Sequence, residues 1–282
     1  MIMKIFSSRD ARFMKILFIG DVVAKPGREA VKEVLPELIK KEKIDLCIAN
    51  IENLTHGKGA TKEKVDEMRE CGVDIFTSGN HIWFREEFRD VLNADPTVIQ
   101  PANYPGDAPG FGFTYANIGK DKILIINLIG RQWIDEPVDE PYRTIDTLLL
   151  DQVEEEKPSA ILVDFHAEAT SEKNALAWFL DGRVTAVVGT HAHIPTADEW
   201  VLPKGTALVT DVGMSGALHS VLGVEPSIII TKQKDPGPTK FEWVESGPRV
   251  FRSVLIETDK KGLPAGKVGL AKSIKRVDKI LD

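Results

Sequence analysis

The sequence has little cysteine, no excess of positive charge and no long apolar run. Its 282 residues include only two cysteines, Cys47 and Cys71, which cannot make a disulfide framework. The net charge of −7 provides no overall basic field, so we expect no extended nucleic acid as a partner. No apolar stretch reaches the length of a membrane span or of a signal-peptide core. We therefore expect a cytoplasmic protein without a membrane partner.

Strand-like and helix-like segments alternate through the first two-thirds of the chain. The strand-like segments are nearly continuous apolar runs, which are typical of strands covered on both faces. They lie at 15–20, 46–50, 74–78, 122–128, 160–165 and 184–188. Helical periodicity is found between them, at 27–43, 61–71 and 171–180. This alternation predicts an α/β fold.

The pattern changes after Thr206. Segments 206–211, 227–231 and 249–259 have the character of strands and no long helix lies between them, which predicts a second, more antiparallel sheet. The chain shows no internal repeat and no clear linker. We expect residues 14–282 to form a single domain, preceded by a flexible extension at residues 1–13.

Polar side chains follow five of the predicted strands, at the point where each strand ends. They are Asp21, Glu52 and Asn53, Asn80 and His81, His166, and the pair His191 and His193. Each has an ordinary structural explanation, such as a helix cap, a surface charge or a turn residue. However, ligands of open α/β sheets bind at the carboxyl ends of the strands. Five strand ends that carry such side chains favour one common site.

The residue types in this set indicate a metal site. In an extended chain His191 and His193 would point to the same side, where two imidazoles can bind one or two ions. Histidine, carboxylate and amide ligands without a thiolate suit Fe or Mn, with Zn as another choice. The set is larger than one ion needs. It matches two ions about 3.5–4 Å apart that share a bridging group, as in many phosphatases and nucleases.

Several short motifs resemble a known family. They are "GD" at 20–21, "IEN" at 51–53, "GNH" at 79–81, His166, "GTHAH" at 189–193 and "TDVGMSG" at 210–216. These motifs resemble the calcineurin-like metallophosphoesterase superfamily, and their order is similar to its YmdB-like bacterial branch of 2',3'-cyclic nucleotide phosphodiesterases. The resemblance covers nearly the whole chain from Met14. It implies a four-layer α/β/β/α sandwich with a dinuclear metal site at the carboxyl ends of the strands.

The resemblance also implies which residues hold the ions. One ion would be bound by Asp21, Glu52, Asn53 and His193, and the other by Glu52, Asn80, His166 and His191. Glu52 would then bridge the two ions. Two departures from the wider superfamily explain why Asn53 is included. Val23 stands where a histidine is usual, and "IEN" replaces the usual Gly-Asp-x-x-Asp.

The implied activity is hydrolysis of small phosphodiesters, above all 2',3'-cyclic nucleotides. A hydroxide that bridges the two ions would attack phosphorus, and His81 would protonate the leaving group. Two alternatives stay open: a phosphomonoesterase or nucleotidase with the same ions, and a metal-binding regulatory protein that acts through partners. The "HGKG" segment at 56–59 either contacts the substrate or forms a surface loop. Whether the chain forms a homo-oligomer also stays open.

Overall fold

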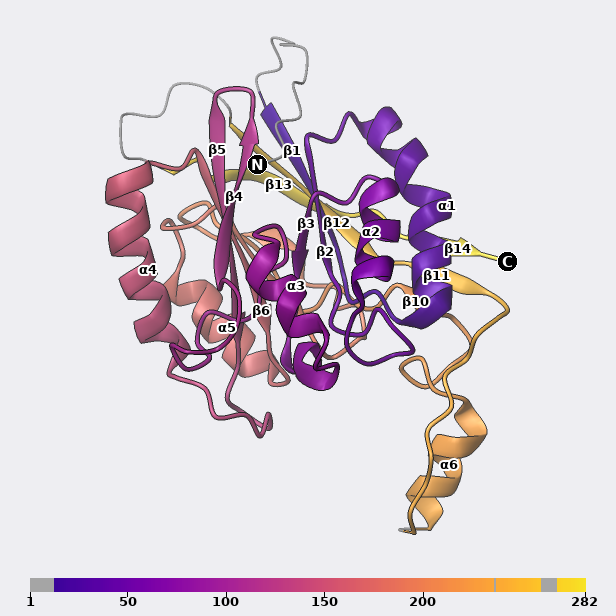
Figure 1. Cartoon of the computed structure of the whole chain (residues 1–282). Coiled ribbons are helices and arrows are strands. Elements are labelled where there is room, and N and C mark those ends of the chain that lie inside the picture. Colours follow the sequence, from indigo (N-terminus) through magenta and orange to yellow (C-terminus); the bar gives the residue numbers. More distant parts are fainter. Residues whose placement is uncertain (1–12, 236, 260–267) are drawn as a thin grey trace.

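Two β-sheets packed face to face, with helices on both outer sides, form the body of the protein (Figure 1). The structure is a computed structural model, and it describes residues 13–235, 237–259 and 268–282. The expected extension at 1–13 lies outside the described residues except for Phe13, where the first strand begins. The division of the chain into an extension and one domain therefore stays a prediction.

The first sheet has five strands and the second has six. The order in the first sheet is β13 (Ala271–Arg276), β12 (Ser253–Asp259), β1 (Phe13–Ile19), β2 (Leu46–Asn50) and β3 (Ile75–Thr77). The order in the second is β4 (Phe113–Ile118), β5 (Asp121–Ile129), β6 (Ala160–His166), β7 (Ala186–Thr190), β9 (Ala207–Val209) and β8 (Trp200–Val201). A small third sheet contains β10 (Gly216–Ala217), β11 (Arg249–Phe251) and β14 (Lys279–Leu281).

Helices cover the outer face of each sheet (Figure 1). On the first sheet lie α1 (Ala24–Glu42), α2 (Lys62–Glu70), the 3₁₀ helix η1 (Asn80–Phe84) and α3 (Phe88–Ala94). On the second sheet lie α4 (Pro141–Glu156) and α5 (Thr170–Phe179). Among the described residues, no helix combines the length and the apolar character needed to cross a membrane.

The alternation of side chains along β1 shows how the layers pack. Leu17 and Ile19 belong to the apolar cluster that also contains Val31 and Leu35 of α1. The neighbouring Ile16 and Phe18 point to the other face, in a cluster with Ile125 and Leu162 of the second sheet. Successive side chains of a strand point to opposite faces, so an apolar run with no polar interruption fills both interfaces. The expected four-layer α/β/β/α sandwich is confirmed.

The carboxyl ends of the central strands meet between the two sheets. Strands β1, β2 and β3 are parallel to one another, and so are β5, β6 and β7. Asn50, at the end of β2, donates hydrogen bonds from Nδ2 to Asp164 Oδ2 of β6 at 3.1 Å and to Thr190 Oγ1 of β7 at 3.4 Å. These contacts bring the loops after both sets of strands to one place.

One expectation for the C-terminal third was wrong, and another holds in part. The segment 227–231 is not a strand, because it lies in the helix α6 (Pro226–Lys234). Pro226 lies in the first turn of this helix, where its ring suits the helical φ and its missing N–H costs nothing. The run 249–259 is split between β11 and β12, and β12 pairs antiparallel with β1 in the first sheet. Of these segments, β11 enters a separate antiparallel sheet, the small third one, whereas β9 and β12 join the two main sheets.

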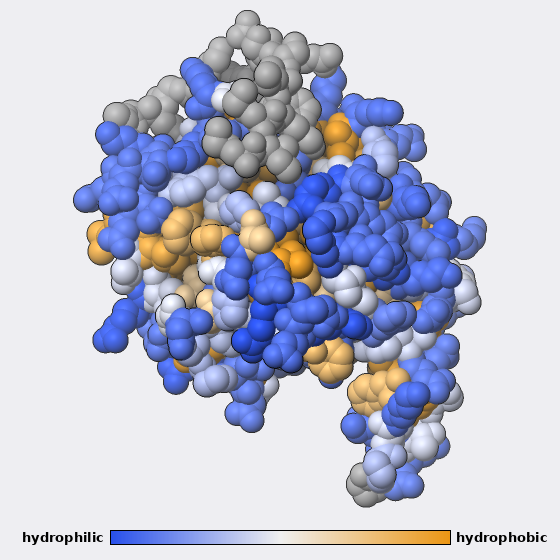
Figure 2. All heavy atoms as spheres, in the orientation of Figure 1, coloured by the Kyte–Doolittle hydropathy of each residue, from blue (hydrophilic) through white to orange (hydrophobic). Residues whose placement is uncertain are grey.

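Helix α6 projects from the body of the molecule (Figure 1). None of its residues is buried, and Ile230 keeps 52% of its surface exposed. Figure 2 shows hydrophobic residues on this projecting part, whereas most of the rest of the same face is hydrophilic. The apolar run at 228–230 therefore adds nothing to the buried core of the described residues.

Candidate metal centre

The structure brings all of the expected site residues to the carboxyl ends of the strands. Asp21 follows β1, Glu52 and Asn53 lie in the turn after β2, and Asn80 and His81 begin η1 after β3. His166 is the last residue of β6, while His191 and His193 follow β7. Asp21, Glu52, Asn53 and His166 are almost completely buried. This burial argues against reading them as ordinary surface charges or turn residues.

The carboxylate and imidazole side chains fall into two groups that share Glu52. One group contains Glu52, His166 and His191, and the other contains Asp21, Glu52 and His193. Within each group the candidate ligand atoms all lie within 4.8 Å of one another. Each group corresponds to the residues that the resemblance assigned to one ion, leaving aside the two asparagines. A carboxylate common to both groups is what a bridging ligand requires.

Short distances connect the members of each group. His166 Nε2 lies 3.1 Å from Glu52 Oε2 and 3.0 Å from His191 Nδ1. His193 Nε2 lies 3.9 Å from Asp21 Oδ1. Three buried or partly buried polar atoms in this region have no hydrogen-bond partner among the described residues: Asp21 Oδ1, Asn80 Oδ1 and His193 Nδ1. A metal ion satisfies such a carboxylate or amide oxygen, so the donor set fits divalent cations.

The pKa values at this site reflect charges buried close together. Burial, opposed by His166 and assisted by Asp211 and Glu52, raises the pKa of Asp21 to about 7. Burial disfavours the charged form of His166, but Glu52, Asp21 and Asp164 raise its pKa to about 9. Burial and the neighbouring His166 charge lower the pKa of His191 to about 3. Carboxylates buried close together favour a cation at this place, as a bound metal ion would supply.

The ring of His166 is oriented by two residues that the sequence motifs did not reveal. His166 Nδ1 lies 2.9 Å from Thr190 Oγ1, and Thr190 Oγ1 donates to Asp164 Oδ1 at 2.8 Å. With Nδ1 held in this way, Nε2 faces Glu52 and the site, which is how supporting hydrogen bonds orient metal-binding histidines. The signal in the sequence was Asp164 itself, a carboxylate inside the apolar run "AILVDF".

The loop that carries His191 and His193 is not an extended chain. Strand β7 ends at Thr190, and His191 and His193 have φ values of 94° and 65°. Both histidines therefore occupy left-handed conformations that side chains other than glycine rarely adopt. The expectation that they share one face of an extended strand was wrong. They reach the same site because the loop turns, and each joins a different group of ligands.

A buried ion pair holds this loop. Asp211 accepts hydrogen bonds from Ala192 N at 3.0 Å and from Gly213 N at 2.8 Å. Lys173 of α5 donates from Nζ to Asp211 Oδ2 at 2.7 Å, and the two side chains are only 3% and 2% exposed. A strained backbone conformation persists when contacts with the surrounding structure hold it in place. Here Asp211 supplies such a contact, because it accepts a hydrogen bond from Ala192, the residue between the two histidines.

Asn53 reaches the site because the chain turns after β2. Its Nδ2 lies 3.1 Å from His193 Nε2 and donates to Glu52 Oε1 at 3.0 Å. Its Oδ1 lies 2.8 Å from His81 Nδ1. Rotation of the amide group by 180° would turn Oδ1 towards His193. The side chain therefore lies between one group of candidate ligands and His81, and its role as a direct ligand stays a prediction.

Comparison with known proteins identifies the family. The family model described as YmdB-like protein matches residues 17–277. The chain belongs to the YmdB-like family. It is 43% identical over 255 residues to the 2',3'-cyclic-nucleotide 2'-phosphodiesterase of Bacillus subtilis (strain 168), covering 90% of this chain and 95% of that protein. The resemblance inferred from the sequence motifs is confirmed.

Solved structures of similar proteins have the same fold. A hypothetical protein from Thermus thermophilus is 40% identical with a TM-score of 0.84, and the match covers 95% of this chain and 99% of that one. A novel phosphatase from Mycoplasma pneumoniae is 34% identical with a TM-score of 0.86, covering 95% and 94%. The metallophosphoesterase fold implies divalent metal ions, and this YmdB-like chain has candidate ligands for them.

Proposed function

We propose that this YmdB-like chain is a phosphodiesterase with a dinuclear metal centre that hydrolyses 2',3'-cyclic nucleotides. The observation that carries the proposal is the position of Glu52, which belongs to both groups of candidate ligands. The relative from Bacillus subtilis, which is named for this activity, supports the choice of substrate. Two divalent ions in such a site polarise the phosphoryl group and lower the pKa of bound water.

We assign the ions to the residues of the two groups, with the two asparagines as further ligands. Asp21, Glu52, Asn53 and His193 would hold one ion, and Glu52, Asn80, His166 and His191 would hold the other. Oδ1 of Asn80 and Oδ1 of Asp21 support this choice, because neither accepts a hydrogen bond within the described part of the chain. Nitrogen and oxygen ligands without a thiolate favour Fe or Mn over a structural zinc site. A cytoplasmic location and a homo-oligomer stay predictions.

His81 is placed to donate a proton to the leaving oxygen. Its side chain is 30% exposed, whereas Glu52 beside it is buried. With Asn53 Oδ1 turned towards the ion that we assign to it, Asn53 Nδ2 would take its place beside His81 Nδ1 and would donate to that nitrogen. The proton of the neutral His81 ring then lies on Nε2, which can donate it to the leaving oxygen. General acid catalysis requires such a positioned donor when the leaving group is an alkoxide.

A substrate panel on manganese-loaded protein tests this function. We expect adenosine 2',3'-cyclic phosphate to be hydrolysed with a higher kcat/KM than adenosine monophosphates or p-nitrophenyl phosphate. Faster turnover of the monoesters would contradict the proposal and favour a nucleotidase. Absence of turnover on every ester, with metals bound, would favour a regulatory protein.

A further inference from the structure

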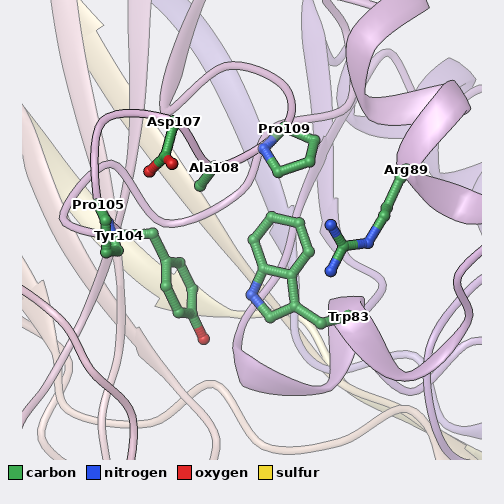
Figure 3. A pocket seen from close by; sticks show the side chains of 7 residues that line it. All are labelled: Trp83, Arg89, Tyr104, Pro105, Asp107, Ala108 and Pro109. Carbon is green, nitrogen blue, oxygen red and sulfur yellow. The ribbon is translucent and has the colours of Figure 1, made fainter.

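A shallow, open cavity of about 220 Å³ lies beside η1. Trp83, Tyr104 and the loop at 105–109 line it, and Arg89 lies at its edge (Figure 3). Figure 3 shows Tyr104 and Arg89 on opposite sides of the Trp83 indole, with Asp107, Ala108 and Pro109 above it. Cavities that enclose a whole ligand usually measure about 300–1,000 Å³. This cavity is therefore of a size for one ring system of a larger ligand.

Both walls of the cavity are tied to segments that carry the metal centre. Trp83 follows His81 by two residues in η1, which corresponds to a rise of about 4 Å along a 3₁₀ helix. On the other wall, Asn103 next to Tyr104 donates to Ile129 O at 2.9 Å and accepts from Ile129 N at 2.9 Å. Ile129 pairs with His166 in the register of β5 and β6. Both walls of the cavity thus belong to segments that carry or directly contact the strands and turns of the metal centre.

Tyr104 forms one wall of the cavity. The ring is buried, with 8% of its surface exposed. Burial raises the pKa of its hydroxyl, and the negative charges of Glu136 and Glu52 raise it further.

The lining offers aromatic surface together with one cation and one carboxylate. The rings of Trp83 and Tyr104 meet edge to face with their centroids 5.2 Å apart. The Arg89 guanidinium lies 5.9 Å from the centre of the Trp83 ring, and Asp107 is on the other side of the opening. A flat heterocycle that both accepts and donates hydrogen bonds suits this lining. Nucleobases have this chemistry, and every base can stack on an aromatic side chain through the flat face of its ring.

We propose that this cavity binds the nucleobase of the substrate while the cyclic phosphate lies at the metal centre. The inference rests on the proposed function, because the nucleobase belongs to the cyclic nucleotide proposed there as the substrate. Trp83 supplies the ring surface, and Arg89 and Asp107 supply the donor and the acceptor at the rim. The cavity then makes the enzyme favour cyclic nucleotides over cyclic phosphodiesters that lack a base.

The test compares adenosine 2',3'-cyclic phosphate with the five-membered cyclic phosphate of glycerol, which has the same ring ester and no base. We expect wild-type, manganese-loaded protein to favour the nucleotide in kcat/KM by about 10- to 100-fold, chiefly through KM, as base stacking contributes. Trp83→Ala should remove most of this preference, and Trp83→Phe should retain part of it. Trp178→Ala is the matched control, because this exposed tryptophan lies on α5 and packs against Trp200.

If Trp83→Ala kept the wild-type preference for the nucleotide, the proposal would be overturned. This holds even if the rates on both substrates fell, because a disturbed η1 would lower both rates equally. Failure of the proposed function gives a different result, since wild-type protein would then hydrolyse neither ester. Calorimetry decides in that case. Metal-loaded protein should bind adenosine 3'-monophosphate at least tenfold more tightly than inorganic phosphate, and Trp83→Ala should abolish the difference. Equal binding of the two ligands by wild-type protein would also overturn it.

Discussion

At the scale of single residues, substitution of His81 gives the most specific test of the proposed acid catalysis. It contacts Asn53 and Glu52 through Nδ1, yet it belongs to neither group of candidate ligands. The opening of a 2',3'-cyclic phosphate expels a ribose oxygen, which is a poor leaving group as an alkoxide. A nitrophenyl ester expels a stable phenolate and needs little help from an acid.

We therefore expect His81→Ala to keep its metals and to lose about 10²–10⁴-fold in rate on 2',3'-cyclic nucleotides. The loss on bis-nitrophenyl phosphate should be much smaller. Steady-state kinetics on both substrates, with metal content measured on the same samples, checks this. Equal losses on the two substrates would show that His81 positions the phosphate or the metals instead of donating a proton.

Gly79 marks how closely the site is packed. A Cβ at this position would lie 2.3 Å from Glu52 Oε2 and 2.3 Å from His166 Nε2. We expect Gly79→Ala to displace these two candidate ligands, so the folded protein should lose bound metal and nearly all turnover. Elemental analysis and circular dichroism check this. Gly106→Ala is the matched control, because a Cβ there meets nothing within 4 Å. Full metal content in Gly79→Ala would refute the assignment of Glu52 and His166.

At the scale of elements, the loop after β7 depends on helix α5. Lys173 of α5 is buried against Asp211, which binds the backbone of Ala192 between the two histidines. Removal of one partner of a buried ion pair leaves an uncompensated charge and costs about 3–5 kcal/mol. We expect Lys173→Met to lower the free energy of unfolding by this amount and to weaken metal binding, as measured by denaturant unfolding and metal titration.

The double variant Lys173→Met, Asp211→Asn removes both charges and should recover part of the lost stability. The control is the exposed pair between Arg183 and Asp146, whose side chains are 38% and 45% exposed. Arg183→Met should cost no more than about 1 kcal/mol, since exposed ion pairs contribute little. If Lys173→Met costs no more than Arg183→Met, the buried pair does not hold the loop.

The elements that the sequence predicted well are those whose burial decides their structure. The run at 160–165 became β6, because its apolar residues fill the interfaces on both faces of the second sheet. The run at 227–231 was assigned wrongly because β-branched residues alone do not specify a strand. Without a neighbouring strand, and with Pro226 in the first turn, these residues form the exposed helix α6.

At the scale of the whole molecule, the sequence predicted the layers and the composition of the site but not its internal geometry. The positions of Asp21, Glu52 and His166 at strand ends followed from the alternating pattern, because parallel strands end at one edge. The supporting contacts of Asp164 and Lys173 join segments far apart in the chain, so no local pattern predicts them. The left-handed conformations of His191 and His193 likewise depend on contacts with distant residues such as Asp211.

The central claim is that two ions, joined by Glu52, carry out hydrolysis of a cyclic phosphodiester. The most direct test titrates metal-free protein with Mn²⁺ and follows bound metal and turnover of adenosine 2',3'-cyclic phosphate together. We predict that turnover rises steeply only as the second equivalent binds. Glu52→Gln should bind at most one ion and show almost no turnover, while Glu63→Gln, an exposed glutamate on α2, should match wild type. Full turnover at one equivalent, or two bound ions without turnover, would contradict the account.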